Sequence, residues 1–279
     1  RQRQMCIRDS LSTSAISIIT NKVSQAATEW QNRPLDSLYM IVWMDGIVFK
    51  VRENGKVINK TVYLCVGLNK EGLKEVLGMW IGKNESAAFW MGVLTDLKAR
   101  GVEDILITVT DNLNGFTETI KSVFPASTTQ ICVVHQIRNS CRYVVWKEKK
   151  EFTADLKNIY NAPTKEAAEM ELDNFEQKWG AKYPYAIRSW RNNWEELTVF
   201  FDFPVEIRKI IYTTNLIENL NGKIRKYTKN KLSFPNDDAL KKSVYLAINE
   251  IEKKWYQPIW NWALIFNQFI TIFENRIQV

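Results

Sequence analysis

The stretch Leu38-Tyr-Met-Ile-Val-Trp-Met-Asp-Gly-Ile-Val-Phe-Lys-Val51 decides the fold of this chain. It is dense in the β-branched and aromatic residues that favour strands, and it carries one carboxylate, Asp45, among apolar neighbours. The next segment, Glu53-Asn-Gly-Lys56, has the Asn-Gly pair typical of a tight hairpin turn, and residues 57–68 supply the return strand. The sequence therefore predicts an antiparallel hairpin at the start of a sheet.

Strands and helices alternate after this hairpin, and a helix at 11–30 precedes it. The predicted elements that follow are a strand at 75–81, a helix from the Ser86 cap to 98, a strand at 104–110, a helix at 113–123 and a strand at 128–133. The pattern from 135 to 203 is helical, with Trp146, Trp179, Trp190 and Trp194 as apolar anchors. Further helices are predicted around Glu218, from 233 onward and at 260–272. This order predicts an α/β protein whose sheet is followed by helices.

The composition is that of a globular protein, with 279 residues, 46% hydrophobic and 25% charged. No apolar run reaches the roughly 18 residues that a membrane-spanning helix needs, and no secretory signal is recognisable at the start. The four cysteines lie at irregular spacing, unlike a disulfide framework. We therefore expect an intracellular protein that is not associated with a membrane.

Positive charge is concentrated around one predicted helix. The net charge of the chain is +7, and residues 205–231 hold seven basic side chains against two acidic ones. A local basic footprint of this kind favours nucleic acid or another polyanion. A solvated basic helix is the alternative interpretation.

Three carboxylates stand where a metal site could form. Asp45 lies within or at the end of the first strand, Asp111 directly follows the strand at 104–110, and Glu218 lies in the basic helix. If the two strands are neighbours, both aspartates project near one rim of the sheet. Hard divalent cations such as Mg²⁺ bind carboxylate oxygens, and a pair of them suits phosphodiester cleavage. A cap or turn role is the alternative for each acid taken alone.

Helical spacing sorts the neighbours of Glu218 into two faces. Thr214, Asn221, Gly222 and Arg225 share the face of Glu218. The opposite face is an apolar stripe that consists of Ile217, Leu220 and Ile224.

The segment Cys132-Val-Val-His135 holds the only histidine of the chain. Such a pair could supply two zinc ligands, but no second pair completes the usual four, and Cys141 would be a weakly specified third. Cys–His nucleophilic catalysis lacks an identifiable supporting group. A buried cysteine and a hydrogen-bonded histidine are the favoured interpretation, and zinc is not expected.

Four segments together resemble the successive signatures of a known family. They are Asp45-Gly-Ile-Val-Phe-Lys-Val-Arg52, Thr110-Asp-Asn-Leu-Asn-Gly-Phe116, Gln130-Ile-Cys-Val-Val-His135 and Tyr212-Thr-Thr-Asn-Leu-Ile-Glu-Asn-Leu-Asn221. In this order they look like the motifs of Mutator-type bacterial transposases of the insertion sequence 256 group. The resemblance extends from about residue 15 to the C-terminus.

This resemblance implies an RNase H-like core with a mixed sheet and a DDE triad. Asp45, Asp111 and Glu218 would be the catalytic and metal-binding residues, with two Mg²⁺ (or Mn²⁺) ions. The core would occupy 36–145 and 204–279, interrupted by an all-α insertion at 146–203 between the second Asp and the Glu. Cys132 and His135 would belong to the core motif without a defined role.

The chain also departs from the family pattern. The family usually has Asp-Gly at the second acid, where this chain has Asp111-Asn112, and asparagine tolerates the same turn. Residues 11–32 resemble only the end of an N-terminal DNA-binding region, and 1–10 match nothing in the family. We therefore expect a chain that lacks most of that region.

The predicted function is that of a DNA transposase, which cleaves strands at the ends of an insertion sequence and joins them to target DNA. Its partner would be double-stranded DNA, bound by a homodimer or higher oligomer on the nucleoid, in the bacterial cytoplasm. The predicted DNA contacts are Asn215, Asn221, Lys223, Arg225, Lys226 and Lys229. Lys50 and Arg52 are weaker candidates, because strand alternation places them opposite Asp45. The alternatives are a truncated, non-transposing remnant that binds DNA or full-length transposase, and a general RNase H-like nuclease.

Overall fold

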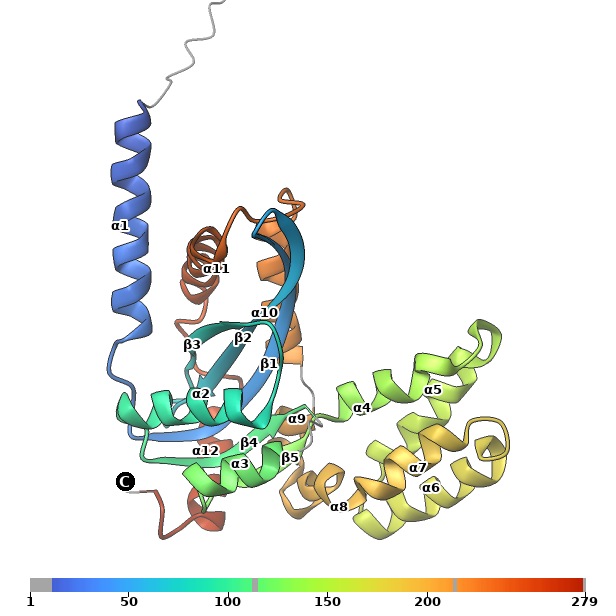
Figure 1. The fold of residues 1–279 in the computed structure, drawn as a ribbon. Coiled ribbons are helices and arrows are strands. Elements are labelled where there is room, and N and C mark those ends of the chain that lie inside the picture. Colours follow the sequence, from blue (N-terminus) through green and yellow to red (C-terminus); the bar gives the residue numbers. More distant parts are fainter. Residues whose placement is uncertain (1–11, 112–114, 213–214, 278–279) are drawn as a thin grey trace, which may run out of the picture.

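The computed structural model describes residues 12–111, 115–212 and 215–277. Its centre is a five-stranded sheet in the order β3-β2-β1-β4-β5 (Figure 1). The strands are β1 (Leu38–Glu53), β2 (Lys56–Leu68), β3 (Lys74–Gly82), β4 (Asp104–Thr110) and β5 (Thr128–Ile131). β2 runs antiparallel to β1 and β3, whereas β4 is parallel to β1 and to β5. This mixed sheet has the strand order and directions of the RNase H-like fold, as predicted.

The β1–β2 hairpin turns where the sequence predicts it. Asn54 and Gly55 both have positive φ, 50° and 77°, as an Asn-Gly hairpin turn requires. The two strands stay paired from Ile41 opposite Leu68 to Glu53 opposite Lys56. Asp45 therefore lies inside a long strand, and not at its end.

Helices cover both faces of the sheet (Figure 1). α2 (Ala87–Ala99) and α3 (Phe116–Val123) bury their apolar side chains in one cluster with Val42 and Met44 of β1. The other face carries α10 (Asn215–Thr228), α11 (Asp237–Glu252) and α12 (Trp262–Ile272). The predicted apolar stripe of α10 is confirmed, since Ile217, Leu220 and Ile224 are all buried.

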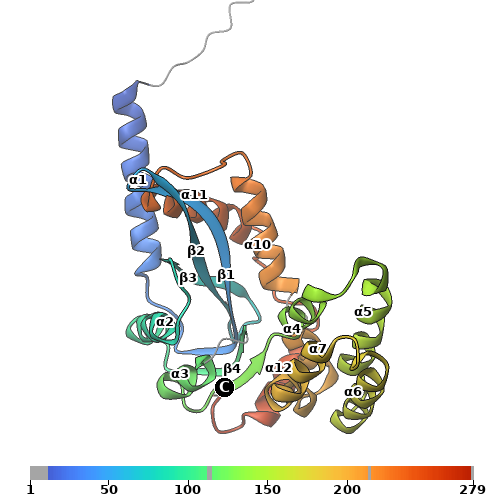
Figure 2. The same cartoon turned by 45° about the vertical axis from the view of Figure 1, so that its right-hand side comes forward.

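A group of helices between β5 and α10 forms a lobe beside the sheet (Figure 2). The helices of this part are α4 (Val133–Ser140), η1 (Cys141–Tyr143), α5 (Trp146–Tyr160), α6 (Lys165–Trp179), α7 (Pro184–Asn192), α8 (Trp194–Leu197) and η2 (Val199–Asp202). The next helix, α9 (Val205–Tyr212), returns the chain to the sheet and contacts α12. Trp179, Trp190 and Trp194 are buried in this lobe as predicted. The prediction for Trp146 is wrong: it is 87% exposed, because it opens α5 on the outer side.

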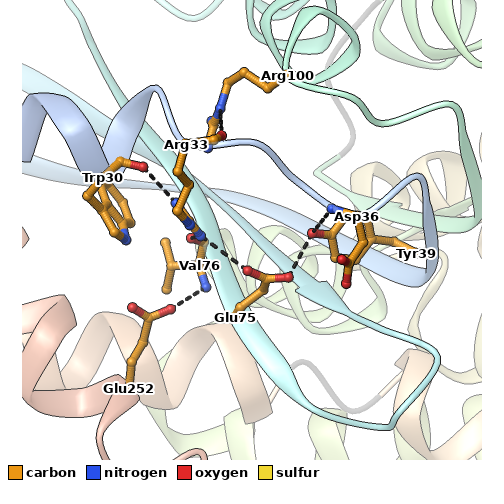
Figure 3. A network of polar contacts seen from close by, with 8 residues as sticks. All are labelled: Trp30, Arg33, Asp36, Tyr39, Glu75, Val76, Arg100 and Glu252. Atoms are coloured by element: carbon orange, nitrogen blue, oxygen red, sulfur yellow. Dashed lines mark hydrogen bonds and ion pairs between the residues drawn. The ribbon is translucent and has the colours of Figure 1, made fainter.

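The edge strand β3 is tied to the helices by side chains that bind its open backbone groups (Figure 3). Arg33, just after α1 (Thr13–Gln31), donates to the carbonyl oxygen of Val76 over 2.7 Å. Glu252, at the end of α11, accepts from the backbone N–H of Val76 over 2.7 Å. Gln31 accepts from the N–H of Met79 over 2.9 Å. These contacts blunt an edge that could otherwise pair with another strand.

Several predicted boundaries shift by a few residues. The strand at 128–133 ends at Ile131, because the thiol of Cys132 accepts from the N–H of His135 and caps α4. The predicted helix at 113–123 begins at Phe116 in the described part, and 112–114 lie outside it. No helix within the described ranges is both long and apolar enough to span a bilayer.

Candidate active site

The two aspartates lie on adjacent parallel strands. β1 and β4 are in register up to the pair Trp43 and Val109. The same register, continued by two residues on each strand, sets Asp45 beside Asp111. Both line a small cavity of about 10 Å³, close to the space that one water molecule fills. The sheet thus brings together the first two predicted acids.

Asp45 is buried, only 7% exposed, and is held by two hydrogen bonds. Its Oδ1 accepts from the N–H of Gly46 over 2.7 Å, and its Oδ2 accepts from Nδ2 of Asn221 over 2.5 Å. Burial and the nearby charge of Asp111 raise the pKa of Asp45 to about 6, although His135 and the two hydrogen bonds act against this. A cation in this cavity would therefore stabilise the ionised form of Asp45 against burial and against repulsion by Asp111.

His135 supplies a positive charge to the aspartates. Its Nδ1 is in close contact with Oδ1 of Asp111, and its Nε2 lies 3.9 Å from Oδ1 of Asp45. Burial alone would lower the pKa of His135, but the side chains of Asp111 and Cys132 outweigh burial and raise that pKa to about 11. The Asp111 contact lacks hydrogen-bond geometry, and neither atom has another hydrogen-bond partner among the described residues. The imidazolium therefore compensates the acids by charge.

Glu218 is displaced from this pair. Its Oε1 forms an ion pair of 2.6 Å with Nη2 of Arg138, and the side chain is about one quarter exposed. The cavity between the aspartates is lined on the α10 side by Ile217 instead. Glu218 nevertheless lies one turn before Asn221, which binds Asp45, so α10 carries it to the same rim of the sheet. The sheet and α10 thus place the three predicted acids at one rim, with the side chain of Glu218 paired with Arg138 of α4.

The oxygen donors at this rim are of the kind that binds a hard divalent cation, although the ligand atoms of Asp45, Asp111 and Glu218 do not all lie within 4.8 Å of one another. Three buried oxygens form no hydrogen bond among the described residues: Oδ1 of Asp111, Oε1 of Glu218 and Oδ1 of Asn221. The first two are each in contact with a basic side chain, His135 and Arg138 respectively. Carboxylate and amide oxygens are the ligands that Mg²⁺ and Mn²⁺ prefer. Asp111, Cys132 and His135, by contrast, bring ligand atoms within 4.8 Å of one another. In this second group the thiol of Cys132 already accepts the hydrogen bond that caps α4. The oxygen ligands are therefore the better candidates for binding a metal ion.

The predicted DNA contacts are divided between two sides of α10. Asn221 faces Asp45, and Arg225 follows it one turn later on the same side. Lys223, Lys226 and Lys229 instead line a groove towards α11. The side chain of Asn215 lies outside the described part. Lys50 and Arg52 are exposed on the strand face opposite Asp45, as alternation predicts.

Sequence reasoning missed three contacts around the site. It treated Asn221 as a DNA contact only, and it did not single out Arg138 or Gln130. Arg138 lies three residues after His135, so both project from one face of α4, a spacing that could have been noticed. Gln130 is fully buried and bridges β5 to Leu197 and Phe200. No local sequence pattern predicts a hydrogen-bonded contact between segments so far apart in the chain.

Comparison with known proteins agrees with this geometry. The chain matches the family described as "Transposase, Mutator family" over residues 2–258. It is 43% identical over 267 residues to a probable transposase for insertion sequence element ISRM3-like of Sinorhizobium fredii, an alignment that covers 95% of this chain and 67% of that protein. It is 41% identical over 245 residues to a probable insertion-sequence transposase of Corynebacterium diphtheriae, which covers 88% of this chain and 71% of that one. The chain thus spans about two thirds of the length of these relatives.

Among solved structures, the catalytic domain of Mos1 transposase is 15% identical, with a TM-score of 0.21, over 67% of this chain and 95% of that one. The fold is defined by the strand order and directions of the sheet. That order defines an α/β protein of the RNase H-like class. Within this class, the chain belongs to the Mutator family of transposases.

Proposed function

We propose that Asp45, Asp111 and Glu218 are the catalytic carboxylates of a DDE transposase core, which cleaves and joins DNA strands of an insertion sequence. The observation that supports this most is the placement of Asp45 beside Asp111 on adjacent strands, with α10 bonded to Asp45 through Asn221. The three acids would hold two Mg²⁺ or Mn²⁺ ions, and zinc is not part of the proposal. The ions would activate the attacking oxygen and stabilise the leaving one.

The proposed reaction has two steps, hydrolysis at the end of the element and transfer of the released strand to target DNA. Water attacks the phosphodiester at the end of the element, the new P–O bond replaces the P–O3′ bond, and a 3′-OH is released. That 3′-OH then attacks a phosphodiester of target DNA, whose own 3′ oxygen leaves as a hydroxyl. No covalent link to the protein and no external energy source is needed. The number of phosphodiester bonds is conserved in the second step.

The residues around the acids have supporting roles in this proposal. Asn221 and the N–H of Gly46 orient the carboxylate of Asp45. His135 and Arg138 compensate the charge of the acids and stay close to the rim where DNA phosphates would arrive. The partner would be double-stranded DNA, both element ends and target, bound by a homodimer or higher oligomer. Such a protein would act on the nucleoid in the bacterial cytoplasm.

The test is a nicking and joining assay on DNA that carries the sequences flanking this gene. Wild type with Mg²⁺ is expected to nick the element end and join it to target DNA, whereas Glu218→Gln and Asp111→Asn are expected to lose both activities. Equal activity of wild type and Glu218→Gln would contradict the proposed site. Cleavage of any duplex without joining would favour a general nuclease, and DNA binding without either activity would favour a non-transposing remnant.

A further inference from the structure

A groove of about 350 Å³ is lined by residues of α10 and α11, two helices that contact each other. Its walls are lysines: Lys223 and Lys226 of α10, Lys229 just after it, and Lys254 just after α11. Ile251, which is only 2% exposed, lies at its base. The groove therefore combines an apolar base with cationic walls.

The positive charge of this groove is not compensated within the protein. The carboxylate that lines it, Glu250, forms an ion pair with Lys253, outside the groove. The ammonium groups of the four groove lysines take part in no ion pair or hydrogen bond among the described residues. Lys74 of β3 is a further positive charge near Lys223. Burial and the charge of Lys223 lower the pKa of Lys74. Like charges that line one groove repel one another, and an anion bound between them would relieve that repulsion.

The groove is separate from the acidic site. Lys223 and Tyr227 come five and nine residues after Glu218, which at 100° per residue places them on the far side of α10. From Glu218 to Lys223 and Tyr227 the helix advances about 7 to 14 Å, the length of roughly two to four phosphate steps along one DNA strand. A strand held at the acids could thus reach the groove several nucleotides away. Tyr227 is 55% exposed there, with a hydroxyl that can donate to a phosphate.

We propose that this groove binds the sugar–phosphate backbone of duplex DNA several base pairs away from the cleaved bond. The inference rests on the proposed function, since it assumes that the acids act on the same DNA. A row of flexible, exposed lysines suits successive phosphates of a backbone, whereas a single small phosphate ligand would favour a planar arginine fork or a buried cradle. The groove would position DNA without reading its sequence.

The test compares single substitutions in DNA-binding measurements without divalent metal, by fluorescence anisotropy on a long duplex of arbitrary sequence. Lys254→Gln is expected to weaken binding several-fold and to reduce the slope of log affinity against log salt by about one. Lys121→Gln, on α3 at the other face of the sheet, removes the same charge and is expected to leave affinity nearly unchanged. Glu250→Gln removes the groove carboxylate and is expected to tighten binding.

The outcomes of these binding measurements separate the groove assignment from the proposed catalytic function. Wild-type affinity and salt slope in both Lys254→Gln and Glu250→Gln would overturn the groove assignment. Lys254-dependent binding of inorganic polyphosphate with unchanged DNA binding would also overturn it, in favour of a small-ligand site. Because binding is measured without metal, absence of cleavage by wild type would contradict the proposed function and not the groove.

Discussion

Asn221 of α10 donates a hydrogen bond of 2.5 Å to the carboxylate of Asp45 in β1, across 176 residues of chain. This bond orients a buried acid and, together with the buried apolar stripe of α10, holds that helix against the sheet. Since Glu218 lies one turn earlier on the same helix, the bond also decides which way Glu218 faces. The structure therefore favours a positioning role for Asn221 over the DNA contact predicted from the sequence.

Asn221→Ala is expected to lower cleavage by roughly 10- to 100-fold, the usual cost of losing a partner that orients a metal ligand. DNA affinity without metal is expected to stay at the wild-type value, because the amide faces Asp45. Both the cleavage rate and the DNA affinity, the latter by anisotropy titration, are measured on the same protein preparations. Arg225→Gln is the matched control on the same face and is expected to weaken DNA binding. A loss of DNA affinity in Asn221→Ala equal to that in Arg225→Gln would restore the DNA-contact interpretation.

Arg138→Gln is expected to tighten Mn²⁺ binding, because Arg138 competes with a cation for Glu218. The pair is partly exposed, so its contribution is about 0.2–1 kcal/mol, which corresponds to a gain of at most about fivefold in affinity. Isothermal titration calorimetry measures this. Arg142→Gln, an exposed arginine one turn further on that stacks on Tyr143, is the control. Weaker Mn²⁺ binding in Arg138→Gln would show that Arg138 supports the site instead of competing for it.

His135→Asn is expected to change how stability depends on pH. The pKa of His135 is raised from 6.5 to about 11, so its stabilising charge is fully present below about pH 6.5 and is lost as pH rises towards 11. The difference in free energy of unfolding between wild type and His135→Asn should therefore shrink between about pH 7 and pH 10. Urea unfolding at several pH values measures it. A difference that stays constant over this range would mean that His135 is neutral in the folded protein.

Gln130→Met is expected to destabilise the contact between sheet and helical lobe. Gln130 donates to the carbonyl oxygen of Leu197 over 2.8 Å and accepts from the N–H of Phe200 over 2.7 Å. Methionine keeps the shape but leaves both buried backbone groups unpaired, at about 1–3 kcal/mol each. Chemical denaturation should show a loss of about 2–6 kcal/mol. Gln25→Met on exposed α1 is the control, and equal stability of the two variants would contradict a bridging role.

The parts of the site that follow from local pattern could be predicted. A strand-forming run ending in Asp-Gly, an Asp directly after an apolar strand and an acid on a basic helix identify Asp45, Asp111 and Glu218 as candidates. The RNase H-like sheet is implied by the resemblance of the four motifs to a known family, whereas the order of elements alone leaves the adjacency of β1 and β4 open. The burial of Asp45, by contrast, depends on how far β1 continues beyond it.

The contacts of Asn221, Arg138 and Gln130 could not be predicted in the same way. Each joins segments that are far apart in the chain, and each depends on the rotation of a helix by less than one turn. Helical spacing gives the faces of α10, but not which face meets Asp45 and which meets α11. The lysines of α10 were therefore predicted near the acids, although Lys223 and Lys226 line the groove on the other side.

The central claim is that Asp45, Asp111 and Glu218 hold divalent ions at one site. Iron(II) in place of Mg²⁺, with ascorbate and peroxide, cuts a polypeptide next to the residues that bind the ion, and peptide mapping locates the cuts. The prediction is cleavage near all three acids, suppressed by excess Mg²⁺ and lost at all three positions in Asp45→Asn. Cuts near Asp45 and Asp111 with none near Glu218 would contradict it.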